Sequence, residues 1–145
     1  MFVQMRGRVA IASLAVLFAG CIAPQTTVMR DIPPHGWCEP VTLVIDNDDT
    51  LSLRRLSFVV HYNTAFRDDV VRADINVIQP DAASFSEMVD IRFAHPYSPS
   101  AVSATETIVY REASVLRQRG NYLFTITPLH PVRGVEAIGL NIEKQ

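Results

Sequence analysis

Several residue types and patterns on which specialised functions depend are scarce in this sequence. Its 145 residues include two cysteines and one tryptophan, and 19% of them are charged, against roughly 25% in an average domain. Two cysteines provide no metal-type cysteine pair, and 13 basic against 15 acidic side chains provide no basic footprint for nucleic acid. Apolar side chains are plentiful, at 48%. The length is that of a single domain.

Residues 1–20 have the pattern of a secretory signal peptide. Two arginines precede an apolar run of eleven residues, from Val9 to Ala19, which is far shorter than the ~20 residues of a membrane-spanning helix. The run ends in the sequence FAGC, which closes on Cys21 and resembles the lipobox of bacterial lipoproteins, with phenylalanine in place of the usual leucine. The resemblance implies cleavage before Cys21 and lipidation of this residue, so that acyl chains hold the protein at a membrane. The alternative is a plain signal peptide that is cut nearby.

The mature chain is expected to begin with a lipidated tether at residues 21–36, followed by a folded domain at 37–145. No acidic residue follows Cys21 closely, whereas surface-exported lipoproteins of the Bacteroidetes often have an acidic cluster there. This difference favours a protein that faces the periplasm, and we expect its anchor to be in the outer membrane. A lipidated Cys21 leaves Cys38 without a partner, and we expect Cys38 to be a buried thiol that packs beside Trp37.

From residue 41 onward, short β-branched runs with alternating apolar and polar side chains are separated by polar breaks. This pattern predicts an all-β fold, an antiparallel β-sandwich of immunoglobulin-like or jelly-roll-like type. A closed small barrel is the alternative architecture. About seven strands are predicted, at residues 41–45, 56–62, 70–78, 85–93, 105–110, 122–127 and 135–143.

A glycine directly before a strand, with a tyrosine two residues later, is the pattern by which many sandwiches turn a corner. Gly120 and Tyr122 have this spacing. Either the Tyr122 hydroxyl bonds to backbone upstream in the chain, or the ring only packs against the core. The role of Tyr122 is structural in both cases.

Patterns of catalytic and metal-binding residues are missing. The four histidines stand singly, without HExxH or HxH spacing, and neither a GxSxG elbow nor a phosphate-binding loop is present. The sequence DNDD at 46–49 has the oxygen ligands that calcium prefers, but the EF-hand positions six and twelve are Leu51 and Ser57, so a turn is favoured. We therefore expect no enzyme activity, no cofactor and no metal site.

Three stretches at the two ends of the mature chain have the character of motifs: DIPPHGW at 31–37, GNYLFTI at 120–126 and GVEAIGLNIEK at 134–144. They resemble, in this order, the IP…GW motif, the G-x-Y-x-F strand and the closing stretch of the gliding-motility lipoprotein family GldH of the Bacteroidetes. The family's usual glycine- and tryptophan-containing segment has no counterpart in residues 92–105. The residues of these motifs to which we assign structural roles are Trp37, Gly120, Tyr122, Gly134 and Gly139.

The resemblance implies a lipid-anchored accessory protein of the cell envelope that binds another envelope protein and is not a catalyst. Its predicted partners are the membrane, through lipid on Cys21, and an envelope protein; nucleic acid is not among them. The loops at 64–69 and 94–103 are the expected contact sites. The alternative is a glycan- or ligand-binding module of an envelope uptake complex.

Overall fold

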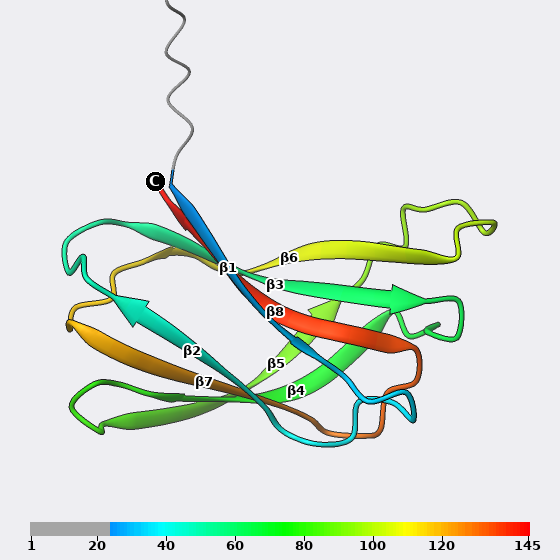
Figure 1. Cartoon of the computed structure of the whole chain (residues 1–145), viewed down its shortest axis with the longest axis horizontal. Coiled ribbons are helices and arrows are strands. Elements are labelled where there is room, and N and C mark those ends of the chain that lie inside the picture. The colour runs from blue at the N-terminus through cyan, green and yellow to red at the C-terminus, as the bar shows by residue number, and fades with distance from the viewer. Residues whose placement is uncertain (1–23) are drawn as a thin grey trace, which may run out of the picture.

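A computed structural model describes residues 24–145 as two four-stranded antiparallel β-sheets that pack face to face (Figure 1). The predicted antiparallel β-sandwich is therefore confirmed. Within residues 24–145 there is no helix, and so none that could cross a membrane. The eight strands are β1 (Gln25–Asp31), β2 (Val41–Asn47), β3 (Arg54–Asn63), β4 (Val70–Ile78), β5 (Ser84–Arg92), β6 (Ser103–Ser114), β7 (Gly120–Pro128) and β8 (Val135–Lys144).

The order of the strands is that of a jelly roll. One sheet has the order β1-β8-β3-β6 and the other β2-β7-β4-β5. Strands β4 and β5 form a hairpin, and β3 pairs with β6, β2 with β7 and β1 with β8. The chain is thus one long antiparallel hairpin whose successive strand pairs alternate between the two sheets, as in eight-stranded jelly rolls. An immunoglobulin fold distributes its strands differently.

The predicted alternation of apolar and polar side chains builds the core. All seven predicted strands are present, and they differ from the prediction only at their ends. On the central strand β4, every second residue from Val71 to Val77 is buried, and the intervening side chains are exposed or half-buried. Because one face of each sheet is apolar, the two sheets bury these faces against each other. The largest fully buried side chains include Trp37, Phe58, Leu43, Ile75 and Ile126.

The structure corrects the predicted tether at 21–36. Residues Gln25–Asp31 form strand β1, which pairs along its whole length with β8. The strand escaped prediction because six of its seven side chains are exposed and the seventh, Val28, is only half-buried, so no alternating pattern marks it. The pairing depends on Gly139, where an added Cβ would lie 2.2 Å from the Met29 sulfur and 2.4 Å from the Val28 carbonyl oxygen.

The structure also corrects the prediction for Cys38, which is a free and exposed thiol. Its neighbour Trp37 is only 1% exposed and pairs with Val132 through two backbone hydrogen bonds of 2.8 and 3.0 Å. Successive side chains of an extended segment point to opposite sides. Since the indole of Trp37 occupies the core, the thiol of Cys38 faces outward.

At the corner before β7, the Tyr122 hydroxyl bonds to backbone upstream in the chain, which is the first of the two predicted arrangements. The ring is buried, and its hydroxyl oxygen accepts a hydrogen bond of 3.0 Å from the Gln118 amide. Gly120 has a φ of +116°, a conformation that residues with a side chain rarely adopt. Asn47 fixes the same corner, because its buried side-chain amide donates to the carbonyls of Leu116 and Gln118 at 2.9 and 2.7 Å.

Glu87 links the two sheets where the sandwich is bounded by the edge strands β5 and β6. Its carboxylate accepts hydrogen bonds from the Tyr110 hydroxyl and the Arg111 guanidinium. Burial alone would raise the pKa of Glu87, but these two hydrogen bonds together hold it below its ordinary value. The carboxylate is therefore charged at neutral pH and ties β5 to β6 across the space between the sheets.

We predict that Gly134→Ala destabilises the fold by about 2 kcal/mol or more. Gly134 has a φ of +83°, and a Cβ there would lie 2.2 Å from the Phe66 amide nitrogen. The matched control is Gly120→Ala, where φ is also positive but the nearest atom to a Cβ is the Pro80 Cβ at 3.2 Å. Urea unfolding should show a larger loss for the variant at 134; an equal or smaller loss would contradict the role of this close approach.

Candidate binding cleft

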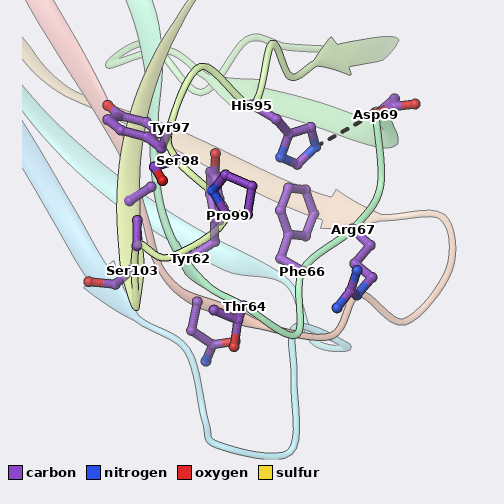
Figure 2. A pocket seen from close by; sticks show the side chains of 13 residues that line it. Tyr62, Thr64, Phe66, Arg67, Asp69, His95, Tyr97, Ser98, Pro99 and Ser103 are labelled. Atoms are coloured by element: carbon purple, nitrogen blue, oxygen red, sulfur yellow. Dashed lines mark ion pairs between the residues drawn. The ribbon is translucent and has the colours of Figure 1, made fainter.

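Two loops that carry the chain between the sheets meet at one end of the sandwich and enclose a cleft. The β3–β4 loop follows Asn63 and the β5–β6 loop follows Arg92 (Figure 1). The cleft has a volume of about 450 Å³, within the range of small-ligand sites. The predicted contact loops at 64–69 and 94–103, which are distant in sequence, provide most of its lining residues (Figure 2).

An aromatic cluster lies at the base of the cleft, and three of its members, Tyr62, Phe66 and His95, line it. The ring centroids of Tyr62 and Phe66 are 4.8 Å apart, and those of Phe66 and Phe93 are 4.7 Å apart at an interplanar angle of 69°. The imidazole of His95 lies 5.5 Å from the Phe66 ring, and Figure 2 shows it directly above that ring. Tilted and edge-on contacts of this kind are favourable for aromatic pairs, so the cluster joins both loops to the end of β3.

A buried carboxylate, Glu106 on β6, fixes the start of the β5–β6 loop. It is 7% exposed and accepts hydrogen bonds from the Ala94 amide at 2.8 Å, the His95 amide at 3.3 Å and the Tyr62 hydroxyl at 2.6 Å. Burial raises the pKa of Tyr62, and the hydrogen bond to Glu106 raises it further. The phenol therefore remains a proton donor to the carboxylate throughout the physiological range.

His95 connects the two loops directly. Its φ of +46° turns the chain so that Nε2 lies 2.9 Å from the Asp68 carbonyl oxygen. A carbonyl only accepts, so Nε2 carries a hydrogen in this contact. The Asp69 carboxylate lies 3.6 Å from the same nitrogen (Figure 2), but it is largely exposed, so this pair contributes little. His95 thus holds the β3–β4 loop against the β5–β6 loop.

The rim of the cleft is polar and open. Tyr97 is half exposed, and its hydroxyl donates to the Thr105 carbonyl, which leaves the ring at the surface. Arg67 and Asp69 lie on the opposite side of the cleft (Figure 2). An aromatic floor with a polar rim suits the binding of a side chain or a sugar ring. Glu106 and His95 are engaged with the loops themselves, which gives them positioning roles.

Most residues singled out by the sequence analysis lie outside this cleft. Cys21 is outside the described residues. Trp37, Gly120 and Tyr122 stabilise the core and the corner, and Gly139 on β8 is paired with Met29 on β1. Gly134 is the nearest, because its backbone contacts the start of the β3–β4 loop at Phe66. Among the four histidines, only His95 lines the cleft.

The role of Glu106 was not predicted from the sequence. Its only signal there is an acidic residue at an inward-facing position of the strand TETIVY. The alternation places Glu106 on the same face as Ile108 and Tyr110, where a charge requires buried partners. Those partners come from β3 and from the β5–β6 loop, which are distant in sequence, so no local pattern predicts them. Among residues 24–145, no three or more His, Cys, Asp or Glu side chains are grouped in a way that could hold a metal ion.

No protein-family model matches the sequence, and no curated protein matches it.

We predict that Glu106→Ala destabilises the fold by about 1–3 kcal/mol and loosens the β5–β6 loop. The variant removes the common acceptor of three hydrogen bonds, so the amides of Ala94 and His95 should exchange faster with solvent. The control is Glu112→Ala on the same strand, whose exposed ion pair with Arg55 is worth about 1 kcal/mol at most. Hydrogen exchange that is equally fast in both variants would contradict the positioning role of Glu106.

Proposed function

We propose that this protein is a lipid-anchored accessory protein of the cell envelope that binds another envelope protein through its cleft end, similar to gliding-motility lipoproteins. One observation carries the proposal. Strand β1 begins four residues after Cys21, at the end of the sandwich opposite the cleft. Lipid on Cys21 would therefore hold one end of the body at the bilayer and leave the cleft free.

The register of the strands supports this orientation. Gln25 at the start of β1 is opposite Glu143, and Asp31 at its end is opposite Ala137, which also pairs with His61 near the end of β3. The cleft begins at the next residue of β3, Tyr62. At about 3.3 Å per residue, the length of β8 separates the two ends by roughly 30 Å. That distance lets the cleft reach a partner beyond the lipid headgroups.

The composition of the cleft supports a protein partner. Aromatic side chains and arginine are enriched at the centres of protein interfaces, with polar groups at the rim. The cleft has the aromatic rings of Tyr62 and Phe66 at its base and the polar side chains of Arg67 and Asp69 at its rim. The loops on both sides are held in place by Glu106 and His95, which reduces the conformational entropy lost on binding.

A second candidate function is a glycan- or ligand-binding module of an envelope uptake complex. The observation that favours it is the size of the cleft, about 450 Å³, together with aromatic rings on which a sugar could stack. Trp37 is too deeply buried to contact a sugar directly, so its fluorescence is a poor probe. Binding would instead be detected at Tyr97 and its neighbours in the β5–β6 loop.

Site-specific photo-cross-linking in intact cells tests the protein-binding proposal. A photoreactive residue at Ser100 should cross-link one discrete envelope protein, whereas the same probe at Thr42, on the outer face of β2, should not. Cys21→Ala should remove the protein from the membrane fraction and reduce the Ser100 cross-link, because anchoring no longer concentrates the two proteins. Equal cross-linking from both positions, or membrane retention of Cys21→Ala, would contradict the proposal.

Titration with cello-, chito- and malto-oligosaccharides tests the second candidate. If the cleft binds sugars, amide resonances of Tyr97, Ser98 and Ala101 should shift saturably, while those of the outer face of β2 stay unchanged. Tyr97→Ala should abolish the shifts without unfolding the domain, since the ring is half exposed. Absence of any saturable shift with these sugars would leave the protein-binding proposal as the better one.

A further inference from the structure

At the end of the sandwich opposite the cleft, the β2–β3 loop (residues 48–53) presents two leucines to solvent. Leu51 is 87% exposed, more than any other large apolar side chain of residues 24–145, and Leu53 is 50% exposed. Isolated exposed apolar residues are common. Here two of them lie on one short loop, beside the point where the chain enters the domain. This arrangement raises the question of which surface they contact.

The loop is held rigidly in this conformation. The Asp49 carboxylate accepts hydrogen bonds from the Leu51 amide at 3.0 Å, the Ser52 amide at 3.1 Å and the Ser52 hydroxyl at 2.6 Å, and it pairs with the Lys144 ammonium at 2.5 Å. The Leu53 carbonyl accepts from the Gln145 amide at 3.0 Å. With these groups satisfied inside the loop, its tip can enter an apolar medium at a lower desolvation cost.

The loop lies beside the N-terminal end of the described chain. Pro24 lines the same surface hollow as Asp48, Asp49 and Lys144, and the Pro24 carbonyl accepts from the Lys144 amide at 3.0 Å. Only two residues lie between Cys21 and Pro24, so the two Cα atoms are about 11 Å apart at most in an extended chain. A lipid on Cys21 therefore brings the bilayer surface to this end of the body.

We propose that Leu51 and Leu53 insert into the headgroup region of the bilayer that holds the Cys21 lipid, so that the sandwich has a fixed orientation on the membrane. This inference rests on the lipid anchor of the proposed function. The β6–β7 loop at the same corner, to which Asn47 is hydrogen-bonded, adds the exposed side chains of Arg117 and Arg119. Arginines at this end of the sandwich can pair with anionic lipid headgroups, whereas the exposed Asp46 and Asp48 at the same end repel them.

A protein partner fits this patch less well than a lipid surface does. A stable protein interface buries about 800 Å² on each partner and has a packed apolar centre, whereas two leucines on a loop tip offer far less. A bilayer needs no complementary shape, and the anchor already supplies the proximity. Two inserted side chains then restrict rotation about the short segment between Cys21 and Pro24 without having to supply the whole binding energy.

The test uses the mature protein, acylated on Cys21, in vesicles of phosphatidylethanolamine and phosphatidylglycerol that contain lipids brominated close to the headgroup. An indole introduced by Leu51→Trp should be quenched by the bromine atoms, and its emission should shift to shorter wavelength. The matched control is Leu129→Trp, which replaces an exposed leucine directly after β7, at the cleft end, and should show neither change. The buried Trp37 contributes the same background to both variants.

The outcomes separate the inference from the proposed function. Mass analysis first establishes whether Cys21 is acylated, and an unmodified Cys21 would overturn both. If the protein is acylated but the indole at 51 is quenched no more than the one at 129, the anchor stands and the insertion of the loop is overturned. In a third variant, Leu51→Asp combined with Leu53→Trp, quenching should fall well below that of Leu53→Trp alone; unchanged quenching would likewise contradict insertion.

Discussion

The burial of one apolar face of each sheet against the other is the constraint on which the rest of this structure depends. Side chains alternate along a strand, so each strand of the core can give only half of its residues to the interior. On β2 and β4 these are the buried positions from Val41 to Asn47 and from Val71 to Val77. Most outward residues of these two strands are polar, with Val44 and Val70 as exposed exceptions, and the candidate cleft lies at the strand ends, where loops cross between the sheets.

The same constraint explains how much of the fold the sequence predicts. Seven strands could be located because apolar residues recur at alternate positions, although on β5 only Ile91 is buried. The role of Tyr122 could be predicted because its spacing from Gly120 is a local pattern. Strand β1 has no such face: it is held by backbone pairing to β8 and by the space that Gly139 leaves. The jelly-roll order is equally invisible to local patterns, since it depends on which strands pair across the whole length of the chain.

The cleft shows the same division between local and distant information. The two loops could be recognised as breaks between strands and selected as contact sites, but their meeting at one end follows from the topology. Glu106 shows why the chemistry of the site was harder to foresee. Its hydrogen-bond partners, Tyr62 and the amides of Ala94 and His95, come from β3 and the β5–β6 loop. In the sequence, the only indication of this hydrogen-bond network is one acidic residue at an inward-facing position of a strand.

The two ends of the sandwich differ in a way that is consistent with one orientation at a membrane. At the cleft end, the buried carboxylate of Glu106 and the imidazole of His95 are hydrogen-bonded to the two loops and hold them in place around the aromatic rings. At the opposite end, Asp49 and Lys144 hold a loop whose leucines are left to solvent. A stiff sandwich transmits orientation between these ends, because its strands are paired along their length. Fixing one end at a lipid surface would therefore also fix the direction in which the cleft is presented, which favours encounter with a partner that is itself held in the envelope.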